Sequence, residues 1–167
     1  MAFDMHIKFG SGKVEIKGAS KHKAHKDEIP ILAWSWGVSN TGDLHSGAGA
    51  IGGGKANVQD ISFTKFVDGA SPALLNACCT GGRVEQAWLY VTNATGDQTD
   101  FLTLELSEGV LVTSLSTGGS GGEDRLTENV TLHFGKFKYS FQPQKPDGAK
   151  DGGTKDFTFN MQEVAKG

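Results

Sequence analysis

The chain has 167 residues, of which 37% are hydrophobic, and this length suits a single domain, residues 1–167, with a buried core. Its 24 glycines and 4 prolines are typical of a β-rich fold with many turns. The formal net charge of −3 has the wrong sign for a protein that binds nucleic acid by neutralising phosphates, and it argues against that class.

Runs of alternating apolar and polar residues predict strands along most of the chain. The expected strands are residues 3–9, 29–39, 58–66, 83–92, 101–106, 110–116, 130–141 and 156–161, with a further short strand at 13–17. A tight turn at Glu108-Gly109 joins two of them, and polar, glycine-rich loops occupy residues 40–55 and 142–155. About eight antiparallel strands indicate a β-barrel or a closed sandwich.

One helix is expected, at about residues 72–79. Ser71 suits the N-cap position, and Pro72 suits the first helical position. Gly81-Gly82 then closes the helix. The predicted fold class is therefore mainly β, an antiparallel barrel or closed sandwich with one short α-helix.

Two of the expected strands carry unusual patterns. In residues 29–39, the side chains Ala33, Ser35 and Gly37 share one face, which becomes small and polar toward its end. We expect that face to meet solvent or a water-filled space. In residues 130–141 the apolar alternation jumps by one position at Gly135-Lys136, as a β-bulge would cause in a strand that bends.

The N-terminus and the cysteines indicate where the protein is made. The first residues show no basic start followed by an apolar run, so we expect no ordinary secretory signal. No stretch approaches the roughly 18 apolar residues of a membrane helix, so we expect no membrane insertion. Cys78 and Cys79 are adjacent and unsuited to an ordinary bridge, which favours a reducing compartment. The expected site of synthesis is the cytoplasm.

Motifs that would indicate an enzyme or a cofactor lack the context they need. The G-x-G-x-x-G pattern at residues 47–52 precedes an expected strand, not the helix that would receive a pyrophosphate. Lysines flank His22 and His25 and disfavour a dication, and the other three histidines are scattered, so a solvated connection is expected there. No G-x-S-x-G nucleophile elbow is present. The sequence predicts no catalytic residue, cofactor or metal.

A glycine-rich, charged segment lies before the long expected strand. Residues 117–122 cannot pack a core, and they are followed by Glu123, Asp124, Arg125 and then Glu128. Because this segment runs directly into a core strand, we expect an anchored, projecting tip. Binding residues concentrate at such places.

Four blocks of the sequence are distinctive and stand in a characteristic order. They are LAWSWGVS at 32–39, VQDISFTKFVD at 58–68, STGGSGGEDRLTENVTLHF at 116–134 and QPQKPDGAKDGG at 142–153. Together they resemble the Hcp family, the haemolysin-coregulated tube proteins of the bacterial type VI secretion system. The resemblance covers about the whole chain and is less distinctive in residues 10–26 and 84–100.

The resemblance implies a β-barrel subunit that assembles into six-membered rings. In that family the rings stack into an inner tube, inside a sheath and beneath a spike, and the expelled tube carries small effectors in its lumen. We therefore expect a homohexamer that contacts sheath and spike proteins. We also expect it to be made in the cytoplasm and secreted without a signal peptide to the extracellular space or a target cell. A chain ending at Gly167 is expected to lack the toxin domain of extended members.

The resemblance also assigns assembly roles to the unusual patterns. The small face at Ala33, Ser35 and Gly37 is expected on the lumen wall, where effectors touch it. Two loops are expected to project from the ring plane and mediate contact between rings or with the sheath, through Asp43, Leu44, His45, Gly47, Gly49, Gly52, Gly53, Glu123, Asp124, Arg125 and Glu128. The alternative is a monomeric barrel that binds carbohydrate or protein and has no transport role.

Overall fold

A computed structural model of the chain describes residues 2–42, 54–94, 96, 98–163 and 165–166. Its strands are β1 (Phe3–Phe9), β2 (Ile29–Pro30), β3 (Ala33–Ser35), β4 (Val38–Asn40), β5 (Ala56–Val58), β6 (Ile61–Phe66), β7 (Ala87–Asn93), β8 (Asp100–Gly118), β9 (Thr127–Phe141), β10 (Lys155–Asn160) and β11 (Ala165–Lys166). Within this described part of the chain the one helix is α1 (Ser71–Thr80). The expected mainly β fold with a single short helix is confirmed.

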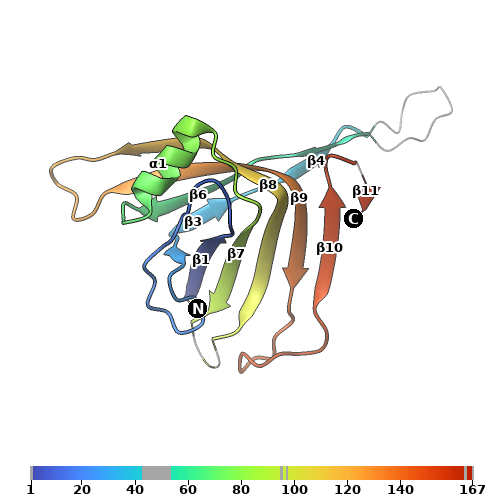
Figure 1. The fold of residues 1–167 in the computed structure, drawn as a ribbon. Coiled ribbons are helices and arrows are strands. Elements are labelled where there is room, and N and C mark those ends of the chain that lie inside the picture. Colours follow the sequence, from blue (N-terminus) through green and yellow to red (C-terminus); the bar gives the residue numbers. More distant parts are fainter. Residues whose placement is uncertain (1, 43–53, 95, 97, 164, 167) are drawn as a thin grey trace.

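The strands pair in an antiparallel circuit. The main sheet has the order β11-β10-β9-β8-β7-β1-β2, and β6 pairs with both β9 and β3. The chain between β2 and β3 completes the circuit, because Ile31 donates its N–H to the Met5 carbonyl and Leu32 donates its N–H to the Thr64 carbonyl. Figure 1 shows the sheet curling around the core, with α1 at one end and β4 extending away from it.

The core follows from the two-residue period of the strands. Alternate side chains on β6, β7, β8 and β9 point inward, and α1 adds two residues from one end. The fully buried side chains include Ile61, Phe63, Leu74, Leu89, Leu104, Leu106 and Leu132. Burial of each such side chain contributes about 1.5–3 kcal/mol, which makes this cluster the main stabilising feature of the fold.

Two predicted strands differ in the structure. Residues 29–39 form three short strands instead of one, because each part has a different partner. β2 pairs with β1, β3 pairs with β6, and β4 pairs with β5. Residues 13–17 form no strand. Gly12 makes an isolated bridge with Val84, and the following chain leaves the sheet edge.

The predicted turn at Glu108-Gly109 is wrong, because β8 runs through these residues without reversing. Both residues have positive φ angles, 57° and 91°, and they bulge between the pairs Ser107↔Lys136 and Val110↔Phe134. On β9 the single residue Gly135 lies opposite these two residues of β8. The predicted break in the alternation at Gly135-Lys136 is therefore confirmed, and the extra residue of the bulge is on β8. At this point β9 also exchanges its other partner, β6, for β10.

The two ends of the helix are capped differently. Ala70 is the N-cap and makes no side-chain capping bond to the first helical N–H groups, so the predicted cap role of Ser71 is wrong. Gly81 has a φ of 65° and ends the helix in the left-handed conformation, as expected. In the described residues, no helix has the length and apolar character needed to cross a membrane.

Candidate functional site

Small side chains form two rows across the outer face of four neighbouring strands. Directly paired residues of a sheet point to the same side, so the cross-strand register defines each row. The first row is Ser35, Ser62, Thr131 and Ser114, and the second is Ala33, Thr64, Asn129 and Ser116. None of these eight residues is charged. We call them the small-residue rows.

Hydrogen bonds between neighbouring strands hold the rows in place. The Ser62 and Thr131 hydroxyls are 3.1 Å apart, and Thr64 Oγ1 donates to Asn129 Oδ1 at 2.6 Å. The rows therefore present an uncharged surface of small side chains, each partly or fully exposed.

The structure places two of the three predicted small-face residues on these rows. Ala33 and Ser35 are exposed on β3, as expected. Gly37 is not on the rows, because it lies between β3 and β4, where its carbonyl accepts the N–H of Gln59. A Cβ atom at Gly37 would lie 3.2 Å from Gln59 Oε1, which is a close contact. Glycine avoids this contact where the chain changes its partner from β6 to β5.

The charged tip lies between the last pair of β8 and β9, Gly118↔Thr127. Glu123, Asp124 and Arg125 are all exposed there. The tip is anchored to the end of β6, because the Arg125 guanidinium carbon lies 3.7 Å from the centre of the Phe66 ring. Figure 1 shows this hairpin projecting past α1.

Glu128 does not belong to the exposed tip, which corrects the prediction. It is 2% exposed on β9, and it contacts the Lys65 ammonium and accepts a hydrogen bond of 2.6 Å from the Ser71 hydroxyl. Lys65 is 0% exposed and also lies 3.0 Å from Asp68 Oδ1. The buried charge of Glu128 is thus matched inside the chain. The other predicted loop residues, Asp43, Leu44, His45, Gly47, Gly49, Gly52 and Gly53, lie outside the described residues.

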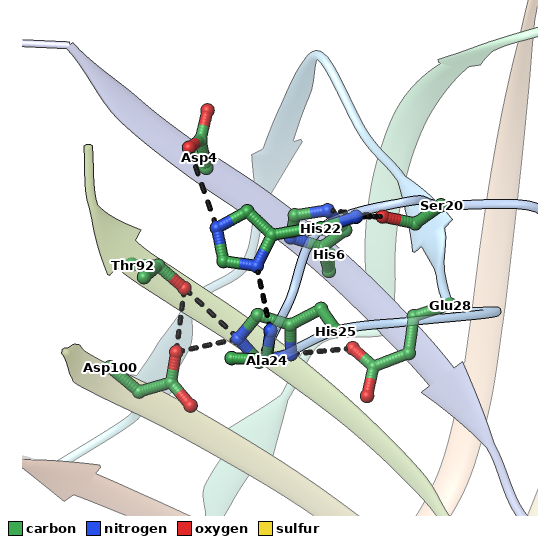
Figure 2. A network of polar contacts seen from close by, with 9 residues as sticks. All are labelled: Asp4, His6, Ser20, His22, Ala24, His25, Glu28, Thr92 and Asp100. Atoms are coloured by element: carbon green, nitrogen blue, oxygen red, sulfur yellow. Dashed lines mark hydrogen bonds and ion pairs between the residues drawn. The ribbon is translucent and has the colours of Figure 1, made fainter. Parts of the chain in front are cut away.

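A cluster of three histidines was not predicted, and the expectation of a solvated connection at His22 and His25 is wrong. His25 is 3% exposed, and its ring is 4.9 Å from that of His6 on β1 (Figure 2). The packing of the connection against β1 brings these rings together, and sequence spacing carries no signal of it. Among the described residues, no group of three or more His, Cys, Asp or Glu side chains is placed to hold a metal ion.

An apolar groove lies between the β4–β5 hairpin and the end of the main sheet. Its lining is formed by Trp36, Val38, Ala56, Val58, Phe137, Tyr139, Phe157 and Phe159. Val38, Tyr139 and Phe157 are each at least 38% exposed. By alternation Tyr139 and Phe141 share a face with the buried Phe137, but here β9 runs past the barrel core, and both side chains are exposed. Contiguous apolar exposure of this kind marks a contact surface.

The chain is similar to proteins of one secretion system. A family model described as "Type VI secretion system effector, Hcp" matches residues 6–141. "Protein hcp1" of Pseudomonas aeruginosa is 52% identical over 164 residues, and the alignment covers 98% of each chain.

Solved structures show the same similarity. One described as a type six secretion system protein matches with a TM-score of 0.90 and 27% identity, over 99% of this chain and 100% of the other. The crystal structure of Hcp1 from Salmonella typhimurium matches with a TM-score of 0.79 and 28% identity, over 99% of each chain. The region that the family model matches includes both small-residue rows and the charged tip.

Proposed function

The chain belongs to the Hcp family, the tube proteins of the type VI secretion system, and we propose that six copies of its barrel close into a ring whose stacking builds that tube. The identity of 52% over the full length to a Pseudomonas aeruginosa Hcp is the observation that carries this proposal. The role is structural, with no catalytic step. Export follows synthesis in the cytoplasm and uses the tube's own expulsion.

The apolar groove supports a contact between copies of the chain. A closed ring joins each copy to the next head-to-tail, so every copy needs two different contact surfaces. The groove residues Val38, Tyr139 and Phe157 offer one such surface, because burying them removes apolar area from water. A head-to-tail ring requires the second surface to lie elsewhere on the same chain.

Native mass spectrometry and negative-stain microscopy test the ring directly. We expect a complex of six chains with a central opening, and the substitution Tyr139→Glu in the groove should reduce it to smaller species. A wild-type protein that stays monomeric at micromolar concentration would contradict the proposal. That result would instead favour a barrel that binds carbohydrate or protein.

The small-residue rows are proposed to line the lumen of the ring. A wall of small, uncharged side chains lets a folded effector pass without binding too tightly to leave. The sheath and the spike would contact the outside and the end of the tube, away from these rows. Effector proteins small enough to enter the lumen are the proposed cargo.

Ser35→Gln tests the lumen assignment. The longer side chain would stand at one end of the first row and narrow the lumen once per subunit, so we expect reduced export of some effectors with ring formation unchanged. Secreted effectors are measured by immunoblot, and ring formation by native mass. Ser39→Gln, an exposed position on β4, is the matched control. Normal levels of every effector in Ser35→Gln would contradict the assignment.

The charged tip is proposed to contact the neighbouring ring or the sheath. Asp124→Lys should therefore leave single rings intact but reduce the amount of Hcp secreted, because the reversal is repeated in every subunit. An exposed charge pair contributes only about 0–1 kcal/mol, so the effect depends on that repetition. Asp151→Lys, an exposed carboxylate of the 142–155 loop, is the control. Equal secretion by both variants would exclude the tip from these contacts.

A further inference from the structure

Three histidines tie a long connection to the wall of the barrel. The connection of residues 10–28 carries His22 and His25, and β1 carries His6. The ring centroid of His6 lies 4.9 Å from that of His25 and 5.1 Å from that of His22. The centroids of His22 and His25 are 5.3 Å apart. Figure 2 shows the three rings grouped between Asp4, Glu28 and Asp100.

His25 and its two carboxylate partners share an added proton. Its Nδ1 lies 2.7 Å from Glu28 Oε2, and its Nε2 lies 2.7 Å from Asp100 Oδ1. An ionised carboxylate only accepts hydrogen bonds, so either both ring nitrogens donate or one carboxyl carries the proton. In both cases the trio holds one proton more than a neutral imidazole with two carboxylates. Burial raises the pKa of Glu28, which favours keeping that proton.

The surroundings of His6, in contrast, favour its neutral form. It is 5% exposed, its Nε2 lies 3.1 Å from the Ser20 hydroxyl, and its Nδ1 is buried with no hydrogen-bond partner. Burial first, and then the charges of His25 and His22, lower the pKa of His6 from 6.5 to about 4. A proton on His6 would place a second buried positive charge against the stacked ring of His25.

We propose that this cluster is an acid-sensitive latch, which holds residues 10–28 on the barrel at neutral pH and releases them when His6 is protonated. The ionisable groups around His6 come from every element packed on it: Asp4 on β1, Tyr90 on β7, Asp100 on β8, and His22, His25 and Glu28 of the connection. Asp4 and Asp100 attract a proton to His6, but burial and the two histidines outweigh them. Burial raises the pKa of Tyr90 to about 12, so Tyr90 stays neutral throughout.

The direction of the effect follows from linkage between protonation and release. The latched state prefers neutral His6, so the contribution of His6 to latching is complete above about pH 6.5 and is lost as the pH falls to about 4. This difference in pKa corresponds to an increase of up to about 300-fold in the equilibrium constant for release. Glu28 acts in the opposite sense, because burial raises its pKa and a raised pKa favours the latched state in acid.

Release of the connection would also change the charge that the surface presents. Its turns are closed by a few backbone hydrogen bonds, such as those from the N–H of Ser20 to the Glu28 carbonyl and from the N–H of Asp27 to the Ser20 carbonyl. It carries Lys13, Lys17, Lys21, Lys23 and Lys26. An expelled subunit that meets an acidic medium would therefore expose this lysine-rich segment.

Hydrogen–deuterium exchange of the full-length protein between pH 7 and pH 4, corrected for intrinsic exchange rates, tests the latch. We expect protection in residues 10–28 to fall by roughly 100-fold over this range, while β8 and β9 keep theirs. Protection of residues 10–28 that stays constant relative to the barrel strands would overturn the proposal.

Variants separate His6 from other acid-sensitive groups. His6→Phe keeps an aromatic ring at this position without a titrating group, and we expect it to abolish the pH dependence in residues 10–28. His133→Phe, on an exposed histidine paired with Asp60, is the control that should retain it. His22→Gln removes a charge that lowers the pKa of His6, so it should reduce the acid-induced loss of protection. This variant keeps the proposal testable should His6→Phe fail to fold. An undiminished loss of protection in His22→Gln, or an unchanged profile in His6→Phe, would refute it.

Discussion

Replacing Lys65 with methionine should lower the free energy of unfolding by about 3–5 kcal/mol, a large share of the stability of a domain of this size. The Lys65 side chain is fully buried, and its ammonium contacts Glu128, the Asp68 carboxylate at 3.0 Å and the Phe66 carbonyl at 2.9 Å. Methionine keeps the volume but removes the charge, so Glu128 is left buried with only the Ser71 hydroxyl to donate to it. Urea unfolding measures the loss.

Two further variants show whether burial is the cause. Lys138→Met breaks an exposed pair, in which Lys138 Nζ lies 3.6 Å from Asp156, and should cost only about 0–1 kcal/mol. Adding Glu128→Leu to Lys65→Met removes the unpaired charge and should recover much of the lost stability. If Lys65→Met costs no more than Lys138→Met, the buried pair is not what holds β6 to β9.

The buried charges show where the sequence was informative and where it was misread. Lys65 has the same parity as Ile61 and Phe63, and Glu128 has the same parity as Val130, Leu132 and Phe134. The alternation therefore already pointed both side chains inward. Charge alone suggested exposure for Glu128, and a charged residue is almost never fully buried unless it is paired. The partner lies 63 residues away, and its proximity depends on the β6–β9 register.

The strands and the helix were predictable because their signals are local. Alternation, Pro72 and Gly81 act within a few residues of one another, and the predicted helix agrees with α1 within one or two residues. The division of residues 29–39 and the bulge at Glu108-Gly109 depend instead on which strand lies alongside. A glycine after a charged residue looks the same in a turn and in a bulge, and only the partner strand decides between them.

The candidate site also combines residues that the sequence indicated with residues that only the fold brings together. Ala33 and Ser35 were visible as a small face, but six of the eight positions in the small-residue rows come from other strands. The histidine cluster had no sequence signal, because His6 and His25 meet through the folding of a 19-residue connection back onto β1. Ring closure itself depends on surfaces of separate chains, which a single sequence does not bring together.

His25→Leu should lower the free energy of unfolding by about 3 kcal/mol at pH 7 and by clearly less near pH 4. Without the imidazole, Glu28 and Asp100 lose the group that lies 2.7 Å from each of them. The pKa of Glu28 is already raised by burial, and His25 is the main group that lowers it, so the variant should raise it further. A raised pKa gives a stability contribution that is present in acid and is lost as the pH rises through the folded-state value.

The penalty of His25→Leu is therefore tied to the ionised form of Glu28, and protonation at low pH relieves it. His133→Leu breaks a histidine–carboxylate pair of the same length, 2.7 Å, whose two side chains are 61% and 37% exposed. It should cost about 0–1 kcal/mol, because water solvates the remaining Asp60. Urea titrations of both variants at pH 7 and pH 4 provide the comparison. A His25→Leu penalty of equal size at the two pH values would mean that lost packing, and not the unpaired carboxylate, destabilises the connection.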